Sequence, residues 1–232
     1  MSIKPIDVAV LCGVISNERE ISLLSCINVA LSLDKEKFKV SIIEISSQGK
    51  WFFTKYDPAK NKLIRFETIG FDIKNWRSDL RKFDVIFIAL HGKLGEDGSI
   101  QSSIQSLGIP YTGSNAKASA LAFDKYQTNS FLTRKDILVP RSLCVNINQQ
   151  KKTNFLESIQ NKIGLPCVIK PNQSGSSIGV TIVRKECDLL GAIKKAERED
   201  KDVVVEEFIE GRELTCAVLG NHSARCIALP PI

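Results

Sequence analysis

A short loop between two apolar runs holds the residues of this chain that are best suited to chemistry. The first run, 167–169, ends at Lys170, and the second occupies 180–183. Between them lie small residues that can hydrogen-bond through a hydroxyl or the backbone, Ser174, Gly175, Ser176 and Ser177. Such a loop can surround a phosphate, with the lysine as its cation, and Gly175 and Gly179 permit positive φ angles or close approach to a ligand. A plain hairpin turn with a surface lysine fits the same residues equally well.

A second candidate site follows the apolar run 84–90. His91, one of only two histidines, opens a stretch to Gly98 that contains three glycines and two acids. In parallel α/β sheets, ligands bind beyond the carboxyl ends of the strands. The pattern therefore favours a ligand site here over an ordinary polar surface loop.

Glu18 lies where a strand, Ile6 to Cys12, passes through Gly13 into a helix expected from Glu18 to Leu33. Asn17 and Glu20 have the spacing of a capping box. An acid at a helix start is stabilised by the helix dipole, so Glu18 alone could be a capping charge or a ligand group.

Composition indicates an ordinary globular protein of 232 residues, with 43% hydrophobic and 25% charged residues. No membrane span or secretory signal is recognisable, and seven cysteines without a CxxC pair fit reduced thiols in the cytoplasm. The net charge of +6 is dispersed, so no basic face for nucleic acid is expected; the nearest approach, Lys194 to Lys201, is interrupted by acids. Neither GxGxxG nor a P-loop motif is present.

The elements that must position these residues change character near residue 114. The first part predicts a parallel sheet, with a second strand from Phe38 to Ile45 and a third from Asp84 to Leu90. Residues 46–82 show little regularity beyond a short strand at Trp51–Phe53. Further expected elements of the first part are a helix at 99–107, a short strand at 109–112, and two helices within 113–135 broken near 123–125.

The second part predicts antiparallel strands with two flanking helices. The strands are expected near 142–145, 167–169, 180–183, 203–205, 214–219 and 225–229, the last two around a turn at Gly220-Asn221. The helices are expected at 154–163, ending at Gly164, and at 186–199.

Together these pieces resemble one family, the D-alanine–D-alanine ligases of the ATP-grasp superfamily. The matching segments run through nearly the whole chain in the family's order: 16–23, His91-Gly92 with 95–98, 110–114, 118–120, Asp124-Lys125, Lys170-Pro171 with 175–180, 206–213 and 216–220. The resemblance implies a Rossmann-like N-terminal domain at 1–113, a central α+β ATP-binding subdomain at 114–206, and the start of an incomplete C-terminal domain at 207–232. This chain differs from the family at two positions. It has Val14 where the family usually has a second glycine after Gly13, and Leu94 where the family has a small or flexible residue, often glycine.

The resemblance also implies a reaction. ATP phosphorylates the carboxylate of one D-alanine, and the amine of a second attacks the acyl phosphate, which serves peptidoglycan synthesis in the cytoplasm. Residue by residue, Glu18 would hold the first ammonium, His91 would line that subsite, and Ser176 would link Glu18 into a hydrogen-bonded network. The ATP site would comprise Lys125 and Lys170 at the phosphates, the loop 174–179 as a lid, Glu206, Phe208 and Ile209 at the adenine, and Glu213 at the ribose.

In the family a further segment supplies a tyrosine, an arginine and the Asp, Glu and Asn ligands of two Mg²⁺ (or Mn²⁺) ions. The resemblance therefore implies metal ligands beyond Ile232 and none within residues 1–232. It implies in turn a chain that is C-terminally truncated and inactive alone, which robust phosphate release from ATP with D-alanine would contradict.

Partners beyond ATP and D-alanine remain open: a second copy of the chain, or a separately encoded C-terminal half, which an adjacent NxxPGxT-type segment would reveal. A D-lactate or D-serine ligase and a non-catalytic nucleotide- or D-alanine-binding fragment are the alternative functions.

Overall fold

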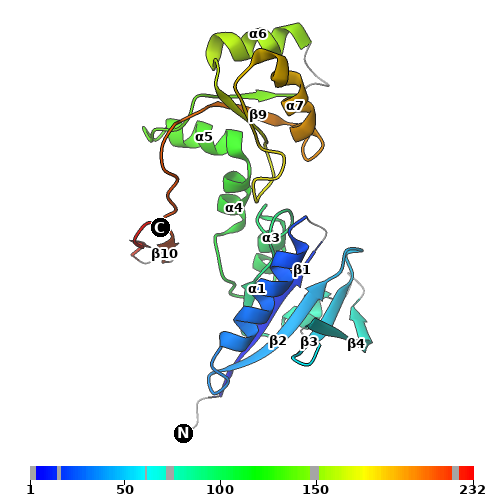
Figure 1. Ribbon diagram of the computed structural model, residues 1–232. Coiled ribbons are helices and arrows are strands. Elements are labelled where there is room, and N and C mark those ends of the chain that lie inside the picture. The colour runs from blue at the N-terminus through cyan, green and yellow to red at the C-terminus, as the bar shows by residue number, and fades with distance from the viewer. Residues whose placement is uncertain (1–3, 15–16, 61, 72–75, 147–151, 221–224) are drawn as a thin grey trace.

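A computed structural model describes residues 4–14, 17–60, 62–71, 76–146, 152–220 and 225–232 (Figure 1). Ser16 of the first motif and Asn221 of the expected turn lie outside these ranges. The described residues form two larger sheets and a two-stranded one, and the helix α4 (Ala116–Phe123) lies between the two larger sheets (Figure 1).

The N-terminal sheet has five strands in the order β4-β3-β2-β1-β5. β1 (Ile6–Gly13) pairs in parallel with both β2 (Phe38–Ile45) and β5 (Val85–Ile88), as the sequence predicts for an α/β sheet. The helix α1 (Arg19–Ser32) connects β1 to β2 and packs against both strands. This arrangement places the β1–α1 loop and the segment after β5 at the same end of the sheet, because parallel strands end at one edge.

The strand expected at Trp51–Phe53 is confirmed, but the expectation that the rest of 46–82 is irregular is wrong. β3 (Trp51–Asp57) and β4 (Lys62–Phe71) extend the sheet by antiparallel pairing, and the short helix α2 (Trp76–Leu80) follows. The strand expected at 109–112 is also wrong, since the only pairing described there is an isolated bridge between Ile86 and Tyr111. Polar residues within β3 obscure its alternation, while its register is set by the neighbouring β2.

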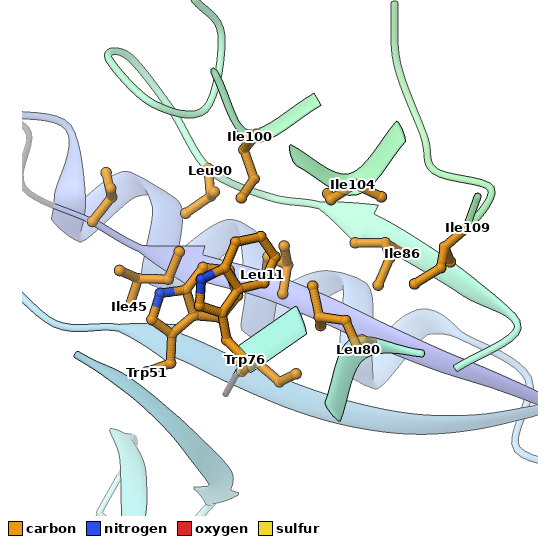
Figure 2. Close-up of a cluster of buried hydrophobic side chains, with 13 residues drawn as sticks. Leu11, Ile45, Trp51, Trp76, Leu80, Ile86, Leu90, Ile100, Ile104 and Ile109 are labelled. Atoms are coloured by element: carbon orange, nitrogen blue, oxygen red, sulfur yellow. The ribbon is translucent and has the colours of Figure 1, made fainter. Parts of the chain in front are cut away.

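The main core of this domain lies on the sheet face opposite α1. Leu11, Ile43 and Ile86 project from the sheet towards Trp76 and Leu80 of α2 and towards α3 (Ser99–Gln105). Trp51 and Trp76 stack with ring centroids 4.7 Å apart and an interplanar angle of 6° (Figure 2). The stack is buried and fastens α2 to the antiparallel part of the sheet.

The second sheet has four strands in the order β6-β9-β7-β8, all antiparallel. Its strands are β6 (Ser142–Val145), β7 (Cys167–Pro171), β8 (Thr181–Val183) and β9 (Val203–Glu207). The helices α6 (Lys152–Lys162) and α7 (Leu189–Glu197, after a 3-10 turn at Glu186–Asp188) share one core with the sheet. Sequence periodicity predicted all of these elements to within a few residues.

Two short helices bridge the two sheets, α4 (Ala116–Phe123) and α5 (Lys125–Thr133). The side chains of Asn115 and Asp124 cap them by accepting hydrogen bonds from the N–H groups of Ala118 and Gln127. The break predicted near 123–125 is therefore confirmed, and Asp124 both ends α4 and starts α5.

The C-terminal segment forms a small hairpin apart from both sheets (Figure 1). β10 (Val218–Leu219) pairs with β11 (Ile227–Ala228), so the two strands are shorter than expected. Beyond β11, Ile232 exchanges two backbone hydrogen bonds with Thr215, at 2.9 and 3.0 Å, which continue the antiparallel arrangement. Among the described residues, no helix combines the length and apolar character that crossing a membrane requires.

We expect Trp76→Ala to lower the free energy of unfolding of the N-terminal domain by about 3–5 kcal/mol, because it removes a buried ring and leaves a cavity beside Trp51. Urea unfolding followed by circular dichroism measures the change. Phe155→Ala, the corresponding truncation in the second core, should instead destabilise the central domain. A loss below about 1 kcal/mol for Trp76→Ala would contradict the packing role.

Candidate active site

The β7–β8 loop has left-handed backbone at its tip, and the lack of a side chain at Gly175 lets the loop lie close to Glu18. Ser176 and Ser177 have φ angles of 48° and 57°, and Gly179 has 75°. Gly175 lies outside the positive-φ region, so the expectation of positive φ holds for Gly179 only. A Cβ on Gly175 would lie 2.8 Å from Oε2 of Glu18, so a larger residue there would require the loop or the Glu18 carboxylate to shift.

Lys125 holds the loop from the side of α5. Its Nζ donates to the carbonyl oxygens of Ser174 at 2.5 Å and Asn172 at 3.2 Å. The Asn172 side chain in turn accepts from the N–H of Tyr126 at 3.0 Å. Burial lowers the pKa of Lys125, and the neighbouring charge of Lys170 lowers it further. A cation in this position is poised to gain from an anionic ligand, because both effects would then be relieved.

Lys170 forms an ion pair with Glu206 across neighbouring strands. Its Nζ lies 2.6 Å from Oε2 of Glu206, and Oε1 of Glu206 accepts from the Asn129 side chain at 2.9 Å. Glu206 is only 6% exposed, so its charge needs these partners. An ammonium has three donors, which leaves Lys170 able to keep Glu206 while contacting a further acceptor.

One pocket of about 440 Å³ collects all ten residues that the sequence predicts for a cofactor: Lys125, Lys170, Ser174, Gly175, Ser176, Ser177, Glu206, Phe208, Ile209 and Glu213. Sequence reasoning missed its apolar wall, formed by Val168, Val180 and Ile182. Strand alternation could have found Val168, because it stands two positions before Lys170 and therefore on the same face of β7.

Glu18 lies in a second pocket, of about 340 Å³, under the same loop. Ser174 and Gly175 line both pockets, and Ser176 Oγ donates a hydrogen bond to Oε1 of Glu18. Glu18 is 8% exposed and stands at the N-cap of α1, but within the described structure its side chain caps no N–H of that helix. The expected capping box is therefore wrong, and Asn17 instead donates to Glu199 at 3.0 Å.

His91 lines an adjoining pocket of about 450 Å³ together with Glu96, while the next residue, Gly92, lines the Glu18 pocket. Nε2 of His91 lies 3.0 Å from Oγ of Ser25, and Nδ1 of His91 lies 3.9 Å from Oε1 of Glu96. Burial raises the pKa of Glu96, and the negative charge of Glu18 raises it further. Ser25 was missed, although it lies two helical turns after Glu18 and so on the same side of α1.

At the two positions where the sequence differs from the family that it resembles, the backbone has the left-handed conformation that favours glycine. Val14 has a φ of 81° and Leu94 a φ of 73°. The left-handed turns beside Glu18 and after His91 are thus formed without glycine at these points.

Comparisons with known proteins decide the family. Two models described as the N-terminus and the C-terminus of D-Ala–D-Ala ligase match residues 7–114 and 132–232. The chain belongs to the D-alanine–D-alanine ligase family. The D-alanine–D-alanine ligase of Thermoanaerobacter sp. (strain X514) is 34% identical over 93% of this chain and 64% of its own length. That of Polaromonas sp. (strain JS666) is 36% identical over 97% of the chain and 59% of its own.

Solved structures give the same ATP-grasp fold. The VanG D-Ala:D-Ser ligase of Enterococcus faecalis has a TM-score of 0.82 and 29% identity, covering 98% of this chain and 69% of that one. The D-alanine–D-alanine ligase of Coxiella burnetii has a TM-score of 0.79 and 26% identity, covering 97% and 70%. This member of the ligase family spans less than two thirds of the length of the two relatives compared above.

A substitution at Gly175 tests the contact between the loop and Glu18. Gly175→Ala should accelerate amide hydrogen exchange of residues 172–180 by about tenfold or more, because the added Cβ would displace the loop from Glu18. Gly191→Ala, in α7 where a Cβ meets nothing within 4 Å, is the matched control and should leave that exchange unchanged. Equal exchange in both variants would show that the loop does not depend on this close approach.

Proposed function

We propose that this ligase-family chain binds ATP and a first D-alanine for the ATP-dependent joining of two D-alanines, which supplies peptidoglycan precursors in the cytoplasm. The observation that carries the proposal is the β7–β8 loop, which lines the lysine pocket on one side and the Glu18 pocket on the other. A loop shared by two pockets can bring a nucleotide phosphate and a small amino acid together. Family membership supports the identity of both substrates.

ATP would occupy the pocket of Lys125, Lys170 and Glu206. The two ammonium groups would neutralise phosphate charge, and the hydroxyls and N–H groups of the loop would bind phosphate oxygens. Phe208 and Ile209 would face the adenine, where Glu206 and the backbone could bind its edge. Glu213, farther along the same wall, would bind the ribose hydroxyls.

The first D-alanine would lie in the Glu18 pocket with its ammonium on that carboxylate. Its own carboxylate would then point towards the loop and attack the γ-phosphorus, so that ADP leaves and a D-alanyl phosphate forms. The neutral amine of the second substrate would attack the acyl carbon, lose a proton and release inorganic phosphate. Fixed donors around both steps would stabilise charge that develops on the transferred phosphoryl group and on the oxyanion.

Magnesium is expected for phosphoryl transfer in general, where it neutralises phosphate charge. Among the described residues, no group of three or more His, Cys, Asp or Glu side chains could hold a metal ion. The Mg²⁺ (or Mn²⁺) ligands that the resemblance implies beyond Ile232 stay a prediction.

D-serine is a second candidate for the second substrate. The solved structure with a TM-score of 0.82 is named a D-Ala:D-Ser ligase, and its fold covers 98% of this chain. D-alanine, D-serine and D-lactate should therefore be compared as the second substrate in one ligation assay. A preference for D-serine would keep the proposed first half-reaction and change only the product.

Lys170→Ala tests the nucleotide pocket. We expect the affinity for ATP to fall by about tenfold to a hundredfold, because a charge-assisted contact to phosphate is lost. Isothermal titration calorimetry measures the affinity, and circular dichroism checks that the variant folds. Lys162→Ala removes the same charge from an exposed position on α6 and should bind ATP normally. Unchanged affinity in Lys170→Ala would contradict the phosphate role.

Glu18→Gln tests the amino-acid pocket without changing its shape. The amide keeps an acceptor for Ser176 but loses the charge, so we expect D-alanine to bind about tenfold more weakly while ATP affinity is retained. Glu20→Gln, exposed in the first turn of α1, is the control. Binding of D-alanine and not of L-alanine by the unmodified chain would support the proposed substrate. Equal binding of the two enantiomers would refute the proposed substrate.

A further inference from the structure

The last turn of α7 and the turn that follows it, residues 195–202, support both ends of the β7–β8 loop. Asp200 Oδ2 accepts from the N–H of Gln173 at 2.7 Å, and the carbonyl of Asp202 accepts from the N–H of Asn172 at 2.9 Å. At the other end of the loop, Lys195 of α7 donates to the carbonyl of Val180 at 3.3 Å. The loop therefore rests on this turn as well as on Lys125.

Glu199 is the residue of this turn that connects it to the N-terminal domain. A Cβ on Gly179 would lie 3.3 Å from Cγ of Glu199, so the methylene groups of Glu199 pack close to the end of the loop. Oε2 of the same side chain accepts a hydrogen bond from Nδ2 of Asn17 at 3.0 Å. One side chain thus contacts the loop with its stem and the other domain with its carboxylate.

Asn17 directly precedes Glu18, and both line the 340 Å³ pocket together with Glu199. The bond between Asn17 and Glu199 is exposed at the rim, whereas the bond between Ser176 and Glu18 is part-buried. The β1–α1 segment is thus linked to the loop directly by the bond between Ser176 and Glu18, and indirectly by the bond between Asn17 and Glu199, whose stem lies close to Gly179. An exposed hydrogen bond can open and close readily, because water replaces it at little cost.

We propose that Asn17 and Glu199 are positioning residues that form a clasp, holding the β7–β8 loop closed over Glu18 and so keeping the first-substrate pocket in shape. Both side chains line the 340 Å³ pocket, and they hold it in shape through the loop. The part of the inference that concerns substrate affinity rests on the proposed function, whereas the part that concerns loop closure does not.

An exchange of the two side chains tests the clasp. Asn17→Asp places two carboxylates against each other and should break the contact. The double variant Asn17→Asp/Glu199→Gln restores a donor facing an acceptor and has the net charge of the original pair. Because both variants carry the same new carboxylate beside Glu18, any direct effect of its charge on that residue cancels between them. Glu199→Gln alone keeps an acceptor for Asn17 and serves as the conservative control.

Hydrogen exchange of residues 172–180 is the first readout. We expect Asn17→Asp to accelerate it by about fivefold or more, as the loss of one hydrogen bond predicts, and the exchanged pair to restore it. Calorimetric titration with D-alanine in the presence of ADP is the second readout. Its affinity should fall by about fivefold in Asn17→Asp and recover in the double variant, while ADP affinity stays within about twofold throughout, because the clasp lies outside the nucleotide pocket.

The outcomes separate the clasp from the proposed function. No change of exchange in Asn17→Asp, or no recovery in the double variant, would overturn the clasp. Faster exchange with unchanged D-alanine affinity would overturn the positioning role. Failure of D-alanine to bind the unmodified chain would count against the proposed function, and the exchange data would still decide whether the clasp exists.

Discussion

The site depends on one contact between two domains, the hydrogen bond from Ser176 to Glu18. It joins residues 158 positions apart and requires the loop to approach a carboxylate that is only 8% exposed. Gly175 makes this approach possible, since a Cβ there would lie 2.8 Å from the carboxylate. The contact gives the loop one surface towards the amino-acid pocket and one towards the nucleotide pocket.

Charge compensation explains why the nucleotide pocket can hold two lysines before any ligand binds. Lys170 is balanced by Glu206, and Lys125 places its ammonium on two loop carbonyls. Each lysine nevertheless lies close enough to the other for Lys170 to lower the pKa of Lys125. An anion bound between the two ammonium groups would relieve their repulsion.

The sequence predicted those parts whose signals are local. Continuous apolar runs identified β1, β2, β7 and β9, and the motif order predicted ten residues that all line one pocket. The sequence did not predict features that depend on contacts with residues far away in the chain. β3 and β4 are strands because β2 offers a pairing edge, Asn17 bonds to Glu199 across 182 positions, and Gly175 is needed for a side chain in another domain. No window of neighbouring residues contains that information.

Val14 shows how packing keeps the geometry of the site when the residue type is unfavourable. A β-branched residue with a φ of 81° costs roughly 1–2 kcal/mol. The side chain is only 3% exposed within the main core, and burial of a valine contributes roughly 1.5–3 kcal/mol. Burial therefore offsets the strain, and the N–H of Val14 still donates to the carbonyl of Ile45 at 2.7 Å. The turn that leads to Glu18 is thus fixed by the sheet edge and the core, so glycine is not required at that position.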